Sequence, residues 1–255
     1  MIGELLGHLA AITDLAGLAF ASGTLLVAYT IFGLTGFGSS IIAIPFLIQV
    51  LPLHTCVAVM LLFDLIVCSL LNFKERHIAD KVELKRILPS LLVGAIGGIL
   101  LSLHAPKKPL FLLLGAFVIA MFVWSNFFNK KSYRISSAFA PPLAFFGGAF
   151  TTLFGTGGPL YTIYLAGRID EKRILRATLG ALIGMTAIIR LVMFSAGGLM
   201  SAPAIYLIAV ILFPFALTGF LLGSLLHKKL DSRAVKKAVW IILLIGGISA
   251  FVKGI

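Results

Sequence analysis

The feature that most constrains this chain is a glycine-rich break that occurs twice within apolar sequence. The first break reads Leu34-Thr-Gly-Phe-Gly-Ser-Ser40 and the second reads Leu153-Phe-Gly-Thr-Gly-Gly-Pro-Leu160. Their glycines are offset by 119 residues, close to half of the 255 residues, which indicates an internal duplication. A glycine run that interrupts an apolar helix at membrane depth leaves backbone groups without partners, and these are tolerated only where they face a cavity or a ligand. We therefore expect function at the two breaks.

Composition places the chain in the membrane. Hydrophobic residues make up 60% of it and charged residues 12%, with a mean hydropathy of +1.11, whereas soluble domains carry about 25% charged residues. The sequence thus predicts an all-α, multi-pass protein of the cell (inner) membrane, in contact with lipids. The net charge of +12 does not indicate nucleic-acid binding, because the basic residues fall in separate short loops. No metal-ligand cluster or nucleotide-binding motif is visible, so neither a metal nor a cofactor is expected.

Apolar runs that are long enough to cross the membrane predict eight transmembrane helices. The hydrocarbon layer is about 30 Å thick, which takes about 20 helical residues. No basic region precedes the first run, so a cleavable signal peptide is not expected. Two other apolar stretches, 38–51 and 157–167, are too short for ordinary spans, and each follows a break. The eight spans are placed near 14–35, 55–72, 87–104, 109–128, 137–154, 175–198, 203–226 and 237–253.

The positive charges predict the orientation of these spans. Segments rich in Lys and Arg stay on the cytoplasmic side, and four segments hold 17 of the 21 basic residues. With these inside, both termini are predicted outside. Residues 14–51 must then enter the membrane and return, and residues 137–167 must do the same from the other face. The four cytoplasmic segments are 73–86, 129–136, 168–176 and 227–237.

The parity of the crossings predicts two inverted repeats. Each would open with a glycine-broken pair of helices, re-entrant or discontinuous, and continue with three spans. This architecture is typical of secondary transporters, whose substrate binds near the membrane midplane. The predicted domains are an N-terminal segment 1–13, a first repeat 14–128, a cytoplasmic linker 129–136 and an inverted second repeat 137–255.

The duplication extends beyond the breaks. Gly94-x-x-x-Gly98 in the third span has a counterpart in Gly219-x-x-x-Gly223 in the seventh. Small residues at this spacing let two helices approach closely in lipid, so we expect both pairs of glycines to lie at helix contacts.

These features resemble the TauE/SafE family of sulfite and organosulfur exporters, also called TSUP. The resemblance covers the chain from about residue 14 and rests on the paired breaks, the eight-span hydropathy and the start of the third span, His77-Ile-Ala-Asp80, followed by the Gly94 to Gly98 run. The chain departs from the family's fuller Gly-Ile-Gly-Gly-Gly pattern in both breaks; the second has Pro159 but no later proline before Arg168. The resemblance implies a carrier of small anions such as sulfite, thiosulfate, sulfonates or related carboxylates, moved outward.

The breaks also make physical sense as an anion site. Where a helix restarts after glycines, its first N–H groups have no partners and its dipole presents partial positive charge. Small oxyanions bind at such helix ends, and glycine allows the ligand close to the backbone. Serine and threonine hydroxyls would add donors. The alternative is that the glycines only form tight turns and helix contacts. The predicted substrate-binding residues of the breaks are Thr35, Gly36, Phe37, Gly38, Ser39, Ser40, Gly155, Thr156, Gly157 and Gly158.

Two charged residues lie deep in the predicted spans, Asp64 and Arg190. They sit at comparable depth in equivalent spans of the two repeats, so we expect them to face each other. Ionisable residues inside a membrane are functional candidates by default, and arginine offers a fork of donors suited to oxyanions. Arg190 would contact the substrate or be held by Asp64 until substrate arrives. Asp64 would either titrate, coupling transport to protons, or form a permanent ion pair that fixes helix register.

Helical spacing adds candidate pathway residues around this pair. Met60, Cys68 and Asn72 share a face with Asp64, and Thr186 stands one turn before Arg190. Tyr161 and its neighbour Tyr164 follow the second break and either line the cavity or anchor the short helix at the headgroups. Each of these side chains has an ordinary packing interpretation as well.

Two other classes of function stay open at this stage. An intramembrane enzyme acting on lipid-linked phosphate would need a base or nucleophile at a break, and neither break contains an acidic residue or a histidine. A non-transporting subunit of a membrane complex is the second alternative. The chain has no ATP-binding motif, so a coupling ion, proton or sodium, or facilitated diffusion would drive transport. A self-contained inverted repeat is compatible with a monomer or a homodimer.

Overall fold

The structure is a computed structural model that describes residues 14–35, 38–72, 76–127, 134–226 and 232–255. The described residues form helices and no strand, as the hydropathy predicts. Two short 3-10 turns, Arg76–Ile78 and Ser137–Phe139, precede helices. The helices are α2 (Leu15–Thr35), α3 (Ser39–Leu47), α4 (Leu53–Asn72), α5 (Lys81–His104), α6 (Lys107–Phe127), α7 (Ala140–Phe154), α8 (Gly158–Ala166), α9 (Lys172–Ala196), α10 (Pro203–Leu226) and α11 (Ser232–Gly254).

Each of the eight predicted spans coincides with one long helix. Six stretches of the described chain are long and apolar enough to cross a membrane: 15–34, 81–104, 107–124, 137–154, 173–196 and 203–226. Helices α4 and α11 contain shorter apolar stretches, Leu53–Val67 and Ile241–Gly254. Six candidate spans are thus found, and the full count of eight remains a prediction. The short helices α3 and α8 occupy the two stretches that the sequence marks as too short to span.

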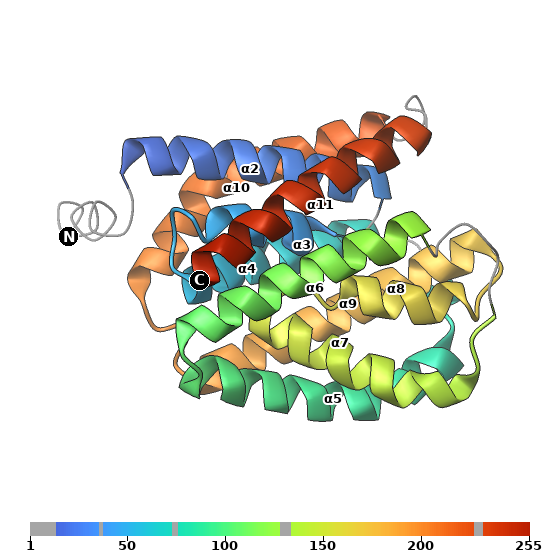
Figure 1. The fold of residues 1–255 in the computed structure, drawn as a ribbon. Coiled ribbons are helices and arrows are strands. Elements are labelled where there is room, and N and C mark those ends of the chain that lie inside the picture. The colour runs from blue at the N-terminus through green and yellow to red at the C-terminus, as the bar shows by residue number, and fades with distance from the viewer. Residues whose placement is uncertain (1–13, 36–37, 73–75, 128–133, 227–231) are drawn as a thin grey trace.

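The helices pack in pairs around a central group. Helix α2 packs on α10, α5 on α7, and α6 on α11. In Figure 1 the α2–α10 pair lies along one side of the molecule and the α5–α7 pair along the opposite side, with α6 and α11 crossing in front. Helices α3, α4, α8 and α9 lie between these pairs (Figure 1), and α4 contacts α9 directly. The breaks α2–α3 and α7–α8 therefore meet in the interior.

Glycines let the helices of the α5–α7 pair and of the α2–α10 pair pack closely together. A methyl group added at Gly94 would meet the backbone carbonyl of Phe145 in α7, and one added at Gly219 would meet that of Leu26 in α2. Gly98 and Gly223 face backbone atoms of the same two partners, α7 and α2. The predicted packing role of these glycines is confirmed.

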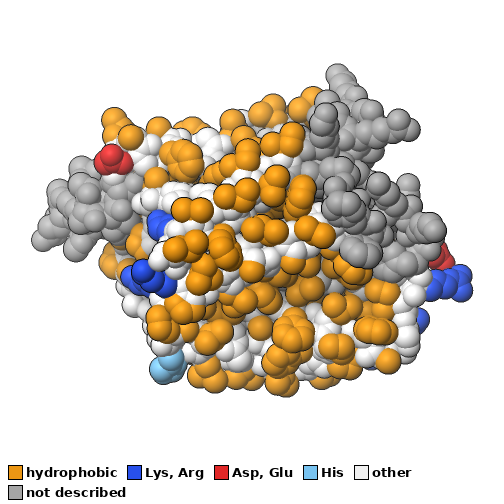
Figure 2. Space-filling view, in the orientation of Figure 1, with side chains coloured by type: hydrophobic (Ala, Val, Ile, Leu, Met, Phe, Trp, Pro, Cys, Tyr) orange, Lys and Arg blue, Asp and Glu red, His pale blue; other side chains and the backbone are white. Residues whose placement is uncertain are grey.

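The surface fits a lipid environment. In Figure 2 apolar side chains cover the middle of the visible face, whereas Lys and Arg lie towards its two ends. Large apolar side chains such as Val93, Ile188 and Val210 are exposed along the helices. Exposed apolar surface on this scale is stable only against lipid or a partner.

Candidate substrate site

The two breaks are built differently from each other. In the first, Gly38 adopts a left-handed conformation, with φ 95°, directly before α3. In the second, Gly155 adopts it, with φ 67°, directly after α7. Side chains other than glycine rarely take this conformation. No side chain caps the first turn of α3 or α8. At α8, Pro159 has no N–H and Leu160 N donates to the Gly157 carbonyl, so α3 offers more amide donors at its start than α8 does.

A cavity lies between the two breaks. The space between its atoms amounts to about 420 Å³, a figure that includes open solvent at its mouth. The starts of α3 and α8 contribute to its wall, so the positive ends of two helix dipoles converge there. Its lining residues are Phe32, Gly38, Ser39, Ser40, Ile41, Asp64, Thr151, Gly155, Thr156, Gly158, Pro159, Tyr161, Ile183, Thr186 and Arg190.

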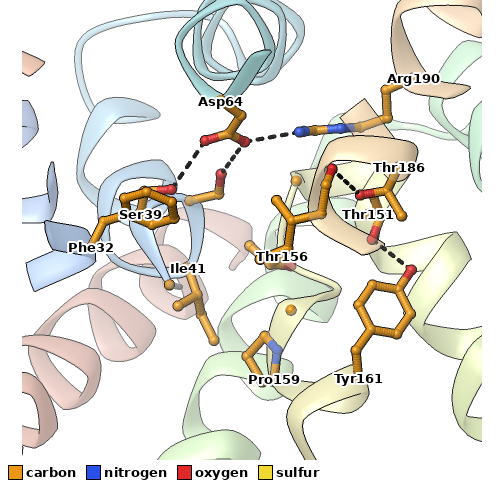
Figure 3. A pocket seen from close by; sticks show the side chains of 15 residues that line it. Phe32, Ser39, Ile41, Asp64, Thr151, Thr156, Pro159, Tyr161, Thr186 and Arg190 are labelled. Atoms are coloured by element: carbon orange, nitrogen blue, oxygen red, sulfur yellow. Dashed lines mark hydrogen bonds and ion pairs between the residues drawn. The ribbon is translucent and has the colours of Figure 1, made fainter. Parts of the chain in front are cut away.

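Asp64 and Arg190 meet in this cavity, as their depth in the sequence predicts. Arg190 Nη2 lies 2.9 Å from Asp64 Oδ2, and the two residues are only 2% and 4% exposed. Ser39 and Ser40 at the start of α3 donate to Asp64 Oδ1 at 3.2 Å and to Oδ2 at 3.4 Å. Figure 3 shows these bonds converging on the carboxylate. Tyr29 of α2, fully buried, donates to Oδ1 at 3.1 Å.

Arg190 uses only part of its donor fork. Its Nε and Nη1 atoms are buried and have no hydrogen-bond partner among the described residues. The hydroxyl of Thr156, in the second break, is also buried without a partner. A buried donor that makes no hydrogen bond costs about 1–3 kcal/mol of stability, and more when the donor is charged. These three donors at one cavity are therefore available to an acceptor from outside the protein, either water or a ligand.

The other predicted residues fall in several places. Tyr161 lines the cavity, where its hydroxyl lies 3.0 Å from that of Thr151. Thr186 lines it too, while donating to the Ile183 carbonyl at 2.8 Å. Met60 is buried in the apolar core and is not among the lining residues.

Gly157 packs against α7, since a methyl group there would meet the Thr151 hydroxyl and the Gly147 carbonyl. Gly158 has no neighbour within 4 Å of an added methyl group, and it lines the cavity. Five predicted site residues lie wholly or partly outside the described part: Gly36 and Phe37 are not described, and neither are the side chains of Thr35, Cys68 and Asn72.

Tyr164 does not line the cavity, which was one of its two predicted positions. Its hydroxyl donates to Glu83 Oε2 of α5 at 2.6 Å. Glu83 is itself buried and also accepts from Arg168 Nε at 3.0 Å and from Arg86 Nη1 at 2.6 Å. This Glu83 cluster joins α8 to α5, next to segments that the charge pattern predicts to be cytoplasmic. The sequence analysis missed it, although an acidic residue at the start of a basic-flanked span is a visible signal.

Other lining residues were also missed. Phe32, Ile41, Pro159 and Ile183 give the cavity an apolar portion, and Tyr29 completes the shell around Asp64. Apolar residues in a membrane helix carry no individual signal, because most of them face lipid or the core. Tyr29 was detectable in principle as a polar side chain five residues before the first break.

Comparison with known proteins agrees with this reading. The profile of the family described as "Sulfite exporter TauE/SafE" matches residues 20–250. The chain is also 28% identical over 172 residues to a probable inner membrane transporter protein, TsaS, of Comamonas testosteroni. The aligned region covers 64% of this chain and 69% of that protein. No solved structure matches it. The resemblance drawn from the glycine breaks is thus confirmed: this chain belongs to the sulfite exporter TauE/SafE family and is a multi-pass membrane transporter, not an enzyme.

Proposed function

We propose that this protein is a secondary transporter of small anions, sulfur oxyanions or organosulfonates such as sulfite, thiosulfate or sulfoacetate. The observation that carries the proposal is the unpaired part of Arg190, with Nε and Nη1 buried at a cavity that two broken helices enclose. An arginine fork binds an oxyanion through two parallel hydrogen bonds. The anion would complete that fork, accept from Thr156, and lie before the positive ends of α3 and α8.

The proposed mechanism is alternating access between two inverted repeats, 14–128 and 137–255, joined by the linker 129–136. The helix boundaries support this division. Helices α2 and α7 end at Thr35 and Phe154, and α3 and α8 begin at Ser39 and Gly158, in both cases 119 residues apart. The packing is exchanged as well, since α2 of the first half packs on α10 of the second and α7 of the second on α5 of the first. Eight spans with both termini outside complete the proposed topology.

Rocking of the two halves would expose the cavity to one face and then to the other. Asp64 lies in the first half and Arg190 in the second, so their ion pair crosses the interface at which such rocking occurs. Outward transport is the proposed direction, in keeping with the word exporter in the family's description. The energy source would be an ion gradient, of protons or sodium, or the substrate gradient itself.

The experiment is uptake of labelled anions into liposomes that contain the purified protein. Sulfite, sulfoacetate, taurine, acetate and phosphate are compared, with Arg190→Ala as the test variant. The expected result is saturable uptake of a sulfur oxyanion that Arg190→Ala abolishes. Thermal unfolding with each anion serves as a second readout, because a bound ligand stabilises the folded state in proportion to the logarithm of its concentration. Uptake that is unaffected by Arg190→Ala would refute this site.

A further inference from the structure

The charge of the cavity wall constrains the charge of its ligand. Among the described lining residues, Asp64 and Arg190 are the charged side chains, and all others are neutral. Both are buried and joined at 2.9 Å. The pair as a whole is therefore neutral before any ligand arrives, even though Arg190 still has donors to offer.

Asp64 is surrounded by hydrogen-bond donors. A carboxylate has about four lone-pair directions, and four donors occupy them: Tyr29 and Ser39 at Oδ1, Ser40 and Arg190 at Oδ2. A proton on either oxygen would displace one of these donors and leave Arg190 as a lone buried charge. This geometry supports the permanent counter-ion, one of the two roles that the sequence left open for Asp64.

We infer that this site selects monoanions over dianions, and that Asp64 is the residue that sets this preference. The inference rests on the proposed function, since it concerns the ligand of that same cavity. A monoanion leaves the cavity with one net negative charge and a dianion leaves it with two. Burial of an uncompensated charge is costly in proteins. The second charge of a dianion has no partner among the described lining residues.

The apolar part of the cavity supports the same class of ligand. Phe32, Ile41 and Pro159 lie across the cavity from Arg190 in Figure 3. A ligand with an anionic head at Arg190 and Thr156 would direct its remaining substituent towards these side chains. A monoanionic sulfonate, R–SO₃⁻, or hydrogen sulfite has this form. Sulfate, thiosulfate, sulfoacetate and fully ionised sulfite do not, because each carries a second charge. The inference therefore narrows the proposed substrates to the monoanions among them.

Three nearly isosteric anions test the inference in liposomes. Methanesulfonate and sulfamate are monoanions, one with an apolar and one with a polar substituent, and sulfate is a dianion of similar size. The wild type is expected to carry both monoanions at least about tenfold faster than sulfate at equal concentration, a ratio that corresponds to about 1.4 kcal/mol. Sulfamate separates the effect of charge from that of the methyl group. Sulfate uptake equal to that of both monoanions would overturn the inference.

Asp64→Asn then tests the assigned residue. The amide removes the negative charge, so Arg190 alone would favour the more highly charged ligand, and the monoanion-to-sulfate ratio is expected to fall at least about fivefold relative to the wild type. Asp170→Asn is the matched control, because it makes the same change at a side chain that is 90% exposed and does not line the cavity; its ratio should equal that of the wild type. An unchanged ratio in Asp64→Asn overturns the role of Asp64.

The outcomes separate the two levels of the proposal. If the wild type carries none of the three anions nor any other sulfur oxyanion, the proposed function itself fails. If it carries sulfate as readily as methanesulfonate, the function stands and the charge selection fails. If Asp64→Asn does not fold, sulfite decides: its uptake should follow the fraction present as hydrogen sulfite and fall as the pH rises through neutrality, while methanesulfonate uptake stays level. A sulfite profile that does not fall would overturn the inference.

Discussion

Replacement of Gly155 by alanine should disable the site through a single methyl group. Gly155 follows α7 with φ 67°, and a methyl group built there would lie 2.8 Å from Arg190 Nη1 and 3.1 Å from Ser40 Oγ. The first distance is shorter than real contacts of this kind, so Arg190 must shift. Its Nη2 is held by Asp64, and the guanidinium is a rigid plane, so the group must turn about that contact and move Nη1 and Nε away from their present positions.

Gly155→Ala should have two effects, one on the stability of the fold and one on the affinity for the anion. The left-handed backbone conformation costs a residue with a side chain about 1–2 kcal/mol of stability. Loss of one charge-assisted hydrogen bond to the ligand costs about 1.5–3 kcal/mol, which is roughly 10-fold to 150-fold in affinity. We therefore expect a modest fall in the unfolding temperature and a large loss of anion binding.

Gly198→Ala is the matched control for this prediction. Gly198 has φ 71°, nearly that of Gly155, but no atom lies within 4 Å of an added methyl group. It should show the same loss of stability with normal anion binding. Thermal unfolding of the detergent-solubilised proteins measures the first quantity, and its dependence on anion concentration measures the second. Equal binding by Gly155→Ala and Gly198→Ala would refute the reasoning that places the ligand beside Arg190.

Three further changes test the site and its frame. Arg190→Lys keeps the charge but loses the fork, so anion uptake should fall at least about tenfold; normal uptake would exclude contact through two donors. Gly94→Ala inserts a methyl group into the α5–α7 contact and should destabilise the protein by about 1–3 kcal/mol, whereas Gly97→Ala, with open space around it, should not; a thermal scan that fails to separate them would contradict the close packing. Glu83→Gln removes the charge at the centre of a buried cluster and should lower the unfolding temperature clearly. Arg134→Gln breaks an ion pair whose side chains are 92% and 90% exposed and should leave that temperature unchanged.

The sequence predicted the elements of this fold well, because hydropathy acts along the chain. The break glycines indicated where α3 and α8 begin, and counting residues from the loops placed Asp64 and Arg190 at one depth. Depth and helix face were enough to expect their contact, since both residues must avoid lipid.

The other contacts depend on which helices, far apart in the sequence, pack beside each other in the fold. Tyr29 reaches Asp64 only because α2 lies beside the first break, and Tyr164 reaches Glu83 only because α8 lies near α5. Neither contact follows from periodicity within one helix. Met60 shows the converse: helical spacing put it on the face of Asp64, but its side chain points into apolar packing.

Helix α8 has a consequence for engineering. It is nine residues long, about 14 Å, with Tyr161 at the cavity and Tyr164 bonded to Glu83. A helix of two and a half turns is too short to bend between these points and moves as a rigid rod. A movement of α8 that separates Tyr164 from Glu83 would therefore also displace Tyr161 at the cavity wall. Variants that weaken the contact between Tyr164 and Glu83 are therefore expected to change the affinity of the cavity for its ligand as well.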